Sequence, residues 1–70
     1  MINKIKINTP YIELDSFLKF ASLVGTGGEA KIVIQGGEVT LNGEVCTQRK
    51  KKLYSGDKVG FEGEEYLVVG

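Results

Sequence analysis

The sequence predicts a small α+β domain in which two short helices pack on a small, mainly antiparallel β-sheet. The chain has 70 residues, which is enough for one domain, so we expect residues 1–70 to form a single unit. The hydrophobic spacing changes from alternation to a helical period and back again. Glycine-containing turn signals then divide the second half of the chain into short segments, as between successive strands.

A short strand is predicted near the start of the chain. Ile5 and Ile7 alternate with polar residues, as in a strand with one buried face. Pro10 cannot donate a backbone hydrogen bond and is expected to end this strand.

The first helix is predicted from residue 14 onwards. Asp15 lies in its first turn, where a negative charge interacts favourably with the helix dipole. Lys19 falls outside the apolar stripe and should face water, and Gly25 is expected to end the helix. The stripe consists of residues spaced i, i+3, i+4 and i+7, namely Leu14, Phe17, Leu18 and Ala21.

A second helix is predicted over residues 27–35. Thr26 can cap its first turn, and Glu29 stands three residues later, as in a capping box. The pair Gly36-Gly37 should stop the helix. Its apolar face is formed by Ala30, Val33 and Ile34.

The remaining segments predict β-strands. Asn42-Gly43 lies between apolar residues and indicates a hairpin with a type I′ turn. A turn cluster at residues 55–57 precedes a strand that contains Val59 and Phe61, and Gly63 marks the turn before a last strand over residues 66–69.

The composition excludes several chemistries. There is no His and one Cys, so the chain cannot supply a Cys/His zinc site, a Ser-His-Asp triad or an internal disulfide. No carboxylates are paired at a spacing that suggests acid–base work, and we predict no enzyme, no metal site and no cofactor. No stretch is apolar enough to span a membrane or to act as a signal peptide, so the cytoplasm is the expected location.

Most aromatic side chains and the single Cys are expected to have a structural role and no role in chemistry. Cys46 is expected to be a small, inert hydrophobic residue in or beside a strand. Three tyrosines could stack on bases, although buried tyrosines are more common: Tyr11, Tyr54 and Tyr66. The residues expected in the core are Phe17, Phe20, Leu23 and Phe61.

Four cations stand together at residues 49–52. Adjacent like charges repel, so the fold is not expected to gain from them, and short basic clusters are typical of nucleic-acid-binding patches. A solvated loop is the alternative. The formal charge is zero, but residues 1–52 carry eight basic and five acidic side chains, a net of +3, whereas residues 53–70 carry one and four, a net of −3. This separation predicts a basic side that can orient the protein on a polyanion.

The segment Thr26-Gly27-Gly28 opens the second predicted helix without bulky side chains. Free N–H groups at such a helix start can bind a phosphate, and Lys31 follows one turn later. A tight turn that needs glycines is the alternative. The segment matches neither the dinucleotide fingerprint nor the Walker loop.

From Leu14 to Val45 the sequence resembles the S4 RNA-binding domain. The resemblance covers about 50 of the 70 residues and is strongest to the small stand-alone bacterial members called YaaA-type proteins. Thr26-Gly27-Gly28 replaces the Ser-Arg-Ser of many relatives, and Glu13 stands where they often have Arg. The shared residues are Leu14-Asp15 with Leu18, Ala30-Lys31, Ile34 with Gly37, Asn42-Gly43 and Gly56-Asp57.

The resemblance implies an S4-like (αL-motif) fold that binds structured RNA through the two helices and the following hairpin. Ribosomal RNA is the expected target and ribosome assembly the expected role. A monomer is expected, without a membrane or small-molecule partner. From the pattern and the resemblance together, the predicted RNA-binding residues are Lys19, Thr26, Gly27, Gly28, Lys31, Gln35, Asn42, Arg49, Lys50, Lys51 and Lys52.

Two other functions stay open. A ubiquitin-like sulfur carrier has similar size and turns but needs a Gly-Gly tail, whereas Gly70 follows Val69 here. A protein-interaction module could instead use the acidic segment at residues 62–65 to bind a basic protein.

Overall fold

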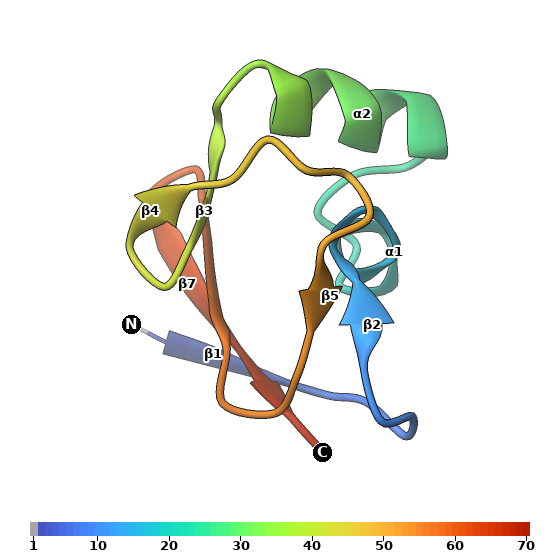
Figure 1. Cartoon of the computed structure of the whole chain (residues 1–70), viewed down its shortest axis with the longest axis vertical. Coiled ribbons are helices and arrows are strands. Elements are labelled where there is room, and N and C mark those ends of the chain that lie inside the picture. The colour runs from blue at the N-terminus through green and yellow to red at the C-terminus, as the bar shows by residue number, and fades with distance from the viewer. Residues whose placement is uncertain (1) are drawn as a thin grey trace.

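The computed structural model describes residues 2–70 and contains two helices and seven strands (Figure 1). Helix α1 spans Leu14–Phe20 and helix α2 spans Gly27–Gln35. The strands are β1 (Ile2–Lys6), β2 (Ile12–Glu13), β3 (Val39–Leu41), β4 (Glu44–Val45), β5 (Lys52–Leu53), β6 (Lys58–Phe61) and β7 (Glu64–Val69).

Five of the strands form one mixed sheet in the order β1-β7-β6-β3-β4. The neighbours in this sheet pair antiparallel except for β1 and β7, which run parallel. The strands β2 and β5 form a separate two-stranded antiparallel sheet, which lies in front of the larger one in Figure 1. The predicted class, two helices on a mainly antiparallel sheet, is confirmed.

One hydrophobic core joins the helices to the sheets. Leu14, Phe17 and Leu18 of α1 are fully buried, as their spacing predicted, and α2 contributes Ala30 and Ile34. The two helices pack on each other, and the sheets supply the rest of this core, including Val39, Leu53, Val59 and Val68. Within residues 2–70, no helix is long and apolar enough to cross a membrane.

Helix α2 has the bounds that the sequence predicts, but α1 ends earlier than expected. Gly25 was predicted to end α1, whereas its last residue is Phe20. Ser22 takes the left-handed conformation at φ 61°, and the N–H groups of Leu23 and Val24 both donate to the carbonyl of Leu18. The chain therefore folds back under the end of the helix, which buries Val24.

The early end of α1 also corrects the predicted core. Phe20 was expected to be buried, but it is 58% exposed, whereas Leu23 is half-buried against the core and Phe61 is buried. The preference for buried tyrosines is wrong for Tyr11 and Tyr54, which are both exposed, while Tyr66 packs partly against the core.

The predicted hairpin forms between β3 and β4. Asn42 and Gly43 both have positive φ, at 52° and 91°, as a type I′ turn requires. On the other side of β3, Thr40 lies opposite Gly60 of β6. A Cβ atom at Gly60 would overlap Oγ1 of Thr40, so only glycine fits this position without a shift of its neighbour.

Candidate functional site

The basic segment at residues 49–52 is attached to the start of α1. The N–H of Leu14 donates to the carbonyl of Lys51 at 2.8 Å, and the N–H of Asp15 donates to the carbonyl of Arg49 at 3.0 Å. These bonds satisfy two of the amides that the first turn of a helix leaves without an internal partner. The backbone of the segment is thus fixed on α1.

Lys50 does not act as a free cation. Its Nζ lies 3.0 Å from Oδ2 of Asp15 and 3.7 Å from Oε1 of Glu13. The expectation that the fold gains nothing from the four cations is therefore wrong for Lys50, because its ammonium group pairs with a carboxylate whose side chain is only 10% exposed. Glu13, at the position where S4 relatives often have Arg, completes this arrangement.

The same contacts set the ionisation of Asp15. Burial alone would raise the pKa of its carboxyl group, but two hydrogen bonds act against it, from Lys50 and from the N–H of Ser16. The charges of Lys50 and Arg49 act in the same direction. The net result is a pKa of Asp15 below its ordinary value, so this carboxylate stays charged at neutral pH and holds Lys50 in place.

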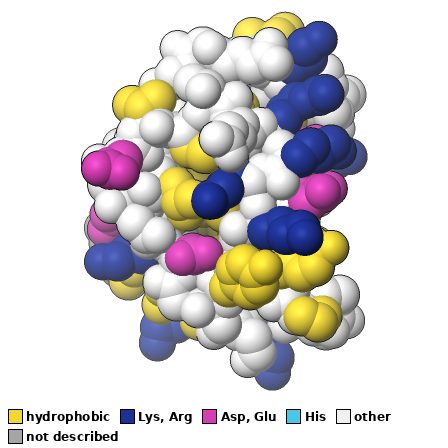
Figure 2. Space-filling view, viewed as in Figure 1, with side chains coloured by type: hydrophobic (Ala, Val, Ile, Leu, Met, Phe, Trp, Pro, Cys, Tyr) yellow, Lys and Arg dark blue, Asp and Glu magenta, His cyan; other side chains and the backbone are white. Residues whose placement is uncertain are grey.

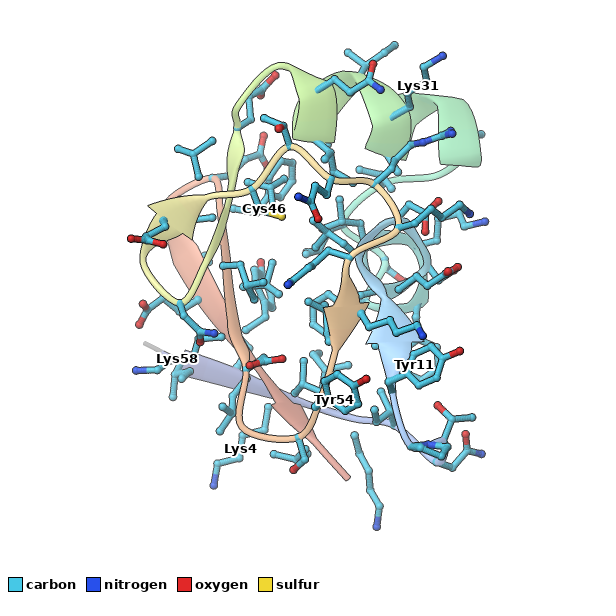
Figure 3. All side chains as sticks on the ribbon, viewed as in Figure 1. Lys4, Tyr11, Lys31, Cys46, Tyr54 and Lys58 are labelled. Carbon is cyan, nitrogen blue, oxygen red and sulfur yellow. The ribbon has the colours of Figure 1, made fainter. Side chains whose placement is uncertain are left out.

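The other cations of this segment and Lys31 form what we call the basic edge: Lys31, Arg49, Lys51 and Lys52. Arg49 is half-buried, and the three lysines are exposed. Figure 2 shows Lys and Arg side chains gathered along one edge of the face drawn, over the helices and the small sheet. Figure 3 places Lys31 at the upper end of this edge, on α2. Lys31 and the basic segment are thus presented on one side of the molecule.

The start of α2 is partly occupied by its own side chains. Oγ1 of Thr26 accepts from the N–H of Glu29 at 3.1 Å, which confirms the predicted cap, and Oε1 of Glu29 accepts from the N–H of Gly25 at 2.6 Å. Within residues 2–70, no acceptor faces the N–H groups of Gly27 and Gly28. The ammonium group of Lys19 lies about 4.0 Å from where a Cβ of Gly27 would stand. Two free amides and one lysine thus lie together, next to the carboxylate of Glu29.

Asn42, which is exposed, makes two hydrogen bonds within the fold. Its Nδ2 donates to Oδ1 of Asp57 at 3.2 Å, and its Oδ1 accepts from the N–H of Lys58 at 2.9 Å. Oδ2 of Asp57 accepts in turn from the N–H of Tyr54 at 2.7 Å. The Asn-Gly and Gly-Asp motifs of the sequence are therefore the two halves of one contact, which uses one N–H and one oxygen lone pair of the Asn42 amide.

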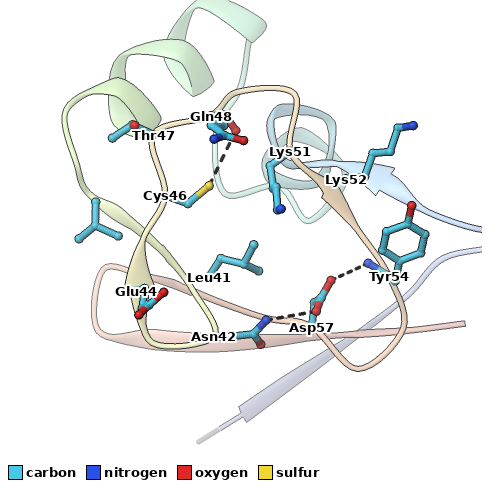
Figure 4. A pocket seen from close by; sticks show the side chains of 11 residues that line it. Leu41, Asn42, Glu44, Cys46, Thr47, Gln48, Lys51, Lys52, Tyr54 and Asp57 are labelled. Atoms are coloured by element: carbon cyan, nitrogen blue, oxygen red, sulfur yellow. Dashed lines mark hydrogen bonds between the residues drawn. The ribbon is translucent and has the colours of Figure 1, made fainter.

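Asn42 nevertheless lines a hollow of about 530 Å³ between the β3–β4 hairpin and the small sheet (Figure 4). Lys51 points into this hollow, and Tyr54 stands at its rim. Gln35, the remaining predicted residue, lies exposed at the last position of α2 and does not line the hollow.

Sequence reasoning underestimated the tyrosines. Tyr11 and Tyr54 pair across β2 and β5 with ring centroids 5.9 Å apart, and Nζ of Lys52 lies 4.9 Å from the centre of the Tyr11 ring. In the sequence, Tyr11 directly precedes β2 and Tyr54 directly follows β5. Both strands have two residues, which is too few to show the alternation typical of a strand. An exposed aromatic pair thus adjoins the basic edge.

The geometry defines a class of protein: a small α+β domain that presents a helix pair and a fixed basic segment on one edge. The S4 domain family profile matches residues 5–69, which is nearly the whole chain, and the chain belongs to this family. The S4-like fold that the sequence resemblance implied is confirmed.

Individual relatives agree with this assignment. The chain is 44% identical over 63 residues to a protein of Bacillus subtilis (strain 168) named "Probable ribosome maturation protein RlbA", with 90% of this chain and 89% of that protein covered. It is 37% identical over 60 residues to YbcJ of Escherichia coli (strain K12), with 86% of each chain covered. The solution structure of YbcJ from E. coli, described as revealing an ALFAL motif involved in RNA-binding, superimposes with a TM-score of 0.69 at 32% identity. That superposition covers 99% of this chain and 86% of YbcJ.

Proposed function

We propose that this protein is a non-enzymatic, cytoplasmic RNA-binding protein that recognises structured ribosomal RNA and takes part in ribosome assembly. The observation that carries the proposal is the basic edge: cations of α2 and of the segment fixed on α1 share one side of a chain whose formal charge is zero. Family membership supports it, as do the ribosome-related name of one relative and the RNA-binding motif described for the other.

The contacts would be made mainly to phosphates. Arg49 is the best candidate for a bidentate contact, because a guanidinium group offers two parallel N–H donors to one phosphate. Lys51 and Lys52 extend the contacts along the same RNA strand. Lys31 and Gln35 of α2 contact the neighbouring RNA backbone. Such contacts fix the position of the protein and carry little sequence information, so recognition is by RNA shape.

The start of α2 would supply a secondary contact. The free N–H groups of Gly27 and Gly28 face one phosphate beside Lys19, and Thr26 holds the turn through its cap. These amides stand where many relatives carry an arginine side chain. The carboxylate of Glu29 lies against the same turn and weakens this contact, so the main binding energy comes from the basic edge.

Lys50 has a different part in this mechanism. Its charge is largely neutralised by Asp15 and Glu13, and its ion pairs hold the segment in the orientation that presents Arg49 and Lys51. We expect Lys50 to contribute to binding through this positioning more than through a phosphate contact.

A salt titration tests the mechanism. With about 4–6 phosphate contacts, the affinity for ribosomal RNA fragments should fall with salt at a log–log slope of about −3 to −5. A slope near zero would eliminate phosphate binding. Crosslinking in cells followed by sequencing of the attached RNA tests the choice of target: recovery of ribosomal RNA supports the proposed role, and its absence refutes it.

A further inference from the structure

We infer that the exposed tyrosine pair next to the basic edge is a stacking platform for one unpaired base of the bound RNA. This inference rests on the proposed function and narrows its ligand to structured RNA that carries an unpaired nucleotide beside a helical stem. Tyr54 supplies the ring, and Lys51 supplies the charge for the phosphate of the same nucleotide.

The exposure of the two rings points to a surface role. Tyr11 is 39% and Tyr54 is 51% exposed, so both rings present part of their surface to solvent. Their planes are tilted by 48°, so the two rings are not stacked face to face. Nζ of Lys52 already lies over the Tyr11 ring, which leaves Tyr54 as the ring with an open face.

The backbone of Tyr54 is fixed before any ligand arrives. Its N–H donates to the carboxylate of Asp57, which is itself held by Asn42, and Leu53 beside it is fully buried. A side chain on such a support loses little conformational freedom on binding, which favours affinity. The backbone from which the Tyr54 ring projects is therefore fixed.

The surroundings of the ring are polar, because the hollow beside it is lined by Lys51 and Asn42 and by the carboxylates of Glu44 and Asp57. Tyr54 forms the rim of the hollow into which Lys51 points, and Lys51 has no ion pair within residues 2–70. Figure 3 shows Tyr11 and Tyr54 near each other on the small sheet, and Nζ of Lys52 lies 4.9 Å from the centre of the Tyr11 ring. Aromatic faces that alternate with cations are the arrangement by which proteins hold unpaired nucleotides, since every base has a face to stack.

The test uses two hairpin RNAs that differ by one nucleotide. One carries a single bulged 2-aminopurine in its stem, the other has a fully paired stem, and in both a non-nucleotide linker closes the stem so that no loop base is unpaired. Tyr54→Leu should weaken binding of the bulged hairpin about 5- to 150-fold, the range for loss of one stacked base, and leave the paired hairpin unchanged. Tyr54→Phe keeps the ring and should bind both RNAs like the parent protein. The 2-aminopurine fluorescence should be quenched by the parent and by Tyr54→Phe, but not by Tyr54→Leu.

The outcomes separate this inference from the proposed function. Salt-dependent binding of both hairpins with no effect of Tyr54→Leu overturns the stacking platform and leaves the proposed function standing. An equal loss for both hairpins also overturns it, because the ring would then not read an unpaired base. Failure of both hairpins to bind overturns both proposals. Circular dichroism checks that each variant is folded, and Tyr54→Trp, which keeps a stacking surface, should retain the preference for the bulged hairpin.

Discussion

Asp15 and Lys50 form an ion pair of 3.0 Å that fastens the basic segment to the first turn of α1. The carboxylate is almost buried and accepts from the N–H of Ser16 as well, whereas Lys50 remains largely exposed. One carboxylate thereby interacts with the helix to which it belongs and positions a loop 35 residues further along the chain. The Leu-Asp motif of this sequence thus holds the basic segment in a fixed orientation.

This pair predicts a specific acid sensitivity. The pKa of Asp15 is held below its ordinary value of 3.8, so the unfolded chain binds a proton first as the pH falls. The stabilisation is complete above that ordinary value and is lost as the pH drops through the lower pKa of the folded state. Asp15→Asn should therefore lower the urea midpoint at about pH 7 and reduce the further loss of stability between about pH 5 and pH 2. Urea unfolding followed by circular dichroism measures both, and an unchanged acid profile in the variant would contradict the assignment.

The four cations of the basic segment should differ in their effect on RNA binding. Arg49→Ala and Lys51→Ala should each reduce the magnitude of the salt slope by about 1, because each removes one phosphate contact. Lys50→Ala should reduce it by less, since the charge of Lys50 is already balanced within the protein. Lys4→Ala is the matched control, because Lys4 projects at the opposite end of the molecule from Lys31 (Figure 3). Equal slopes for the Arg49 and Lys4 variants would place the RNA elsewhere.

Asn42 should matter for stability and not for RNA affinity. Asn42→Ala removes two hydrogen bonds and puts Ala, which tolerates positive φ less well than Asn, at this turn position, and together these changes should cost about 1–3 kcal/mol. Asn42→Gly restores the backbone freedom without the hydrogen bonds and should cost less. Thermal unfolding measures the stabilities. RNA titrations below the unfolding range should give the parent affinity for both variants, and a selective loss of affinity would restore Asn42 as a binding residue.

The contact between Gly60 and Thr40 predicts a coupled pair of substitutions. Gly60→Ala should destabilise the fold by about 1–3 kcal/mol, because the new methyl group overlaps Oγ1 of Thr40 across the β3–β6 pair. Thr40→Ala removes that oxygen, so Gly60→Ala should cost less in the Thr40→Ala background. A double-mutant cycle by urea unfolding gives the coupling free energy, which should differ from zero. Additive effects would mean that the strand pair accommodates the methyl group by another movement.

The elements set by local interactions were predictable from the sequence. The bounds of α2 follow from a capping threonine at one end and two glycines at the other, and the β3–β4 turn follows from Asn42-Gly43. These signals act between neighbouring residues, so no tertiary information is needed to read them. The buried face of α1 was likewise correct, since hydrophobic spacing alone determines it.

The errors arose where distant residues decide the outcome. The end of α1 depends on Ser22 in a left-handed conformation that glycine usually takes, so no glycine marks this end in the sequence, and Val24 beyond it is buried in the core. The strands β2 and β5 have two residues each, too few to show alternation, and exist because they pair with each other. The role of Lys50 and the exposure of Tyr54 follow from this pairing, so neither could be derived from spacing. The predicted RNA-binding residues stay a prediction, which the titrations above address.

The position of β7 between β1 and β6 has a consequence for how the molecule is made. During synthesis β1 leaves the ribosome first, yet its hydrogen-bonding partner is the strand made last among the seven. Until β7 emerges, the hairpins can form but β1 stays unpaired, and an open strand of this kind can pair with a neighbouring chain. Lys4 and Lys6 are exposed and alternate along that strand, and lysines on an unpaired strand oppose its pairing with a neighbouring chain.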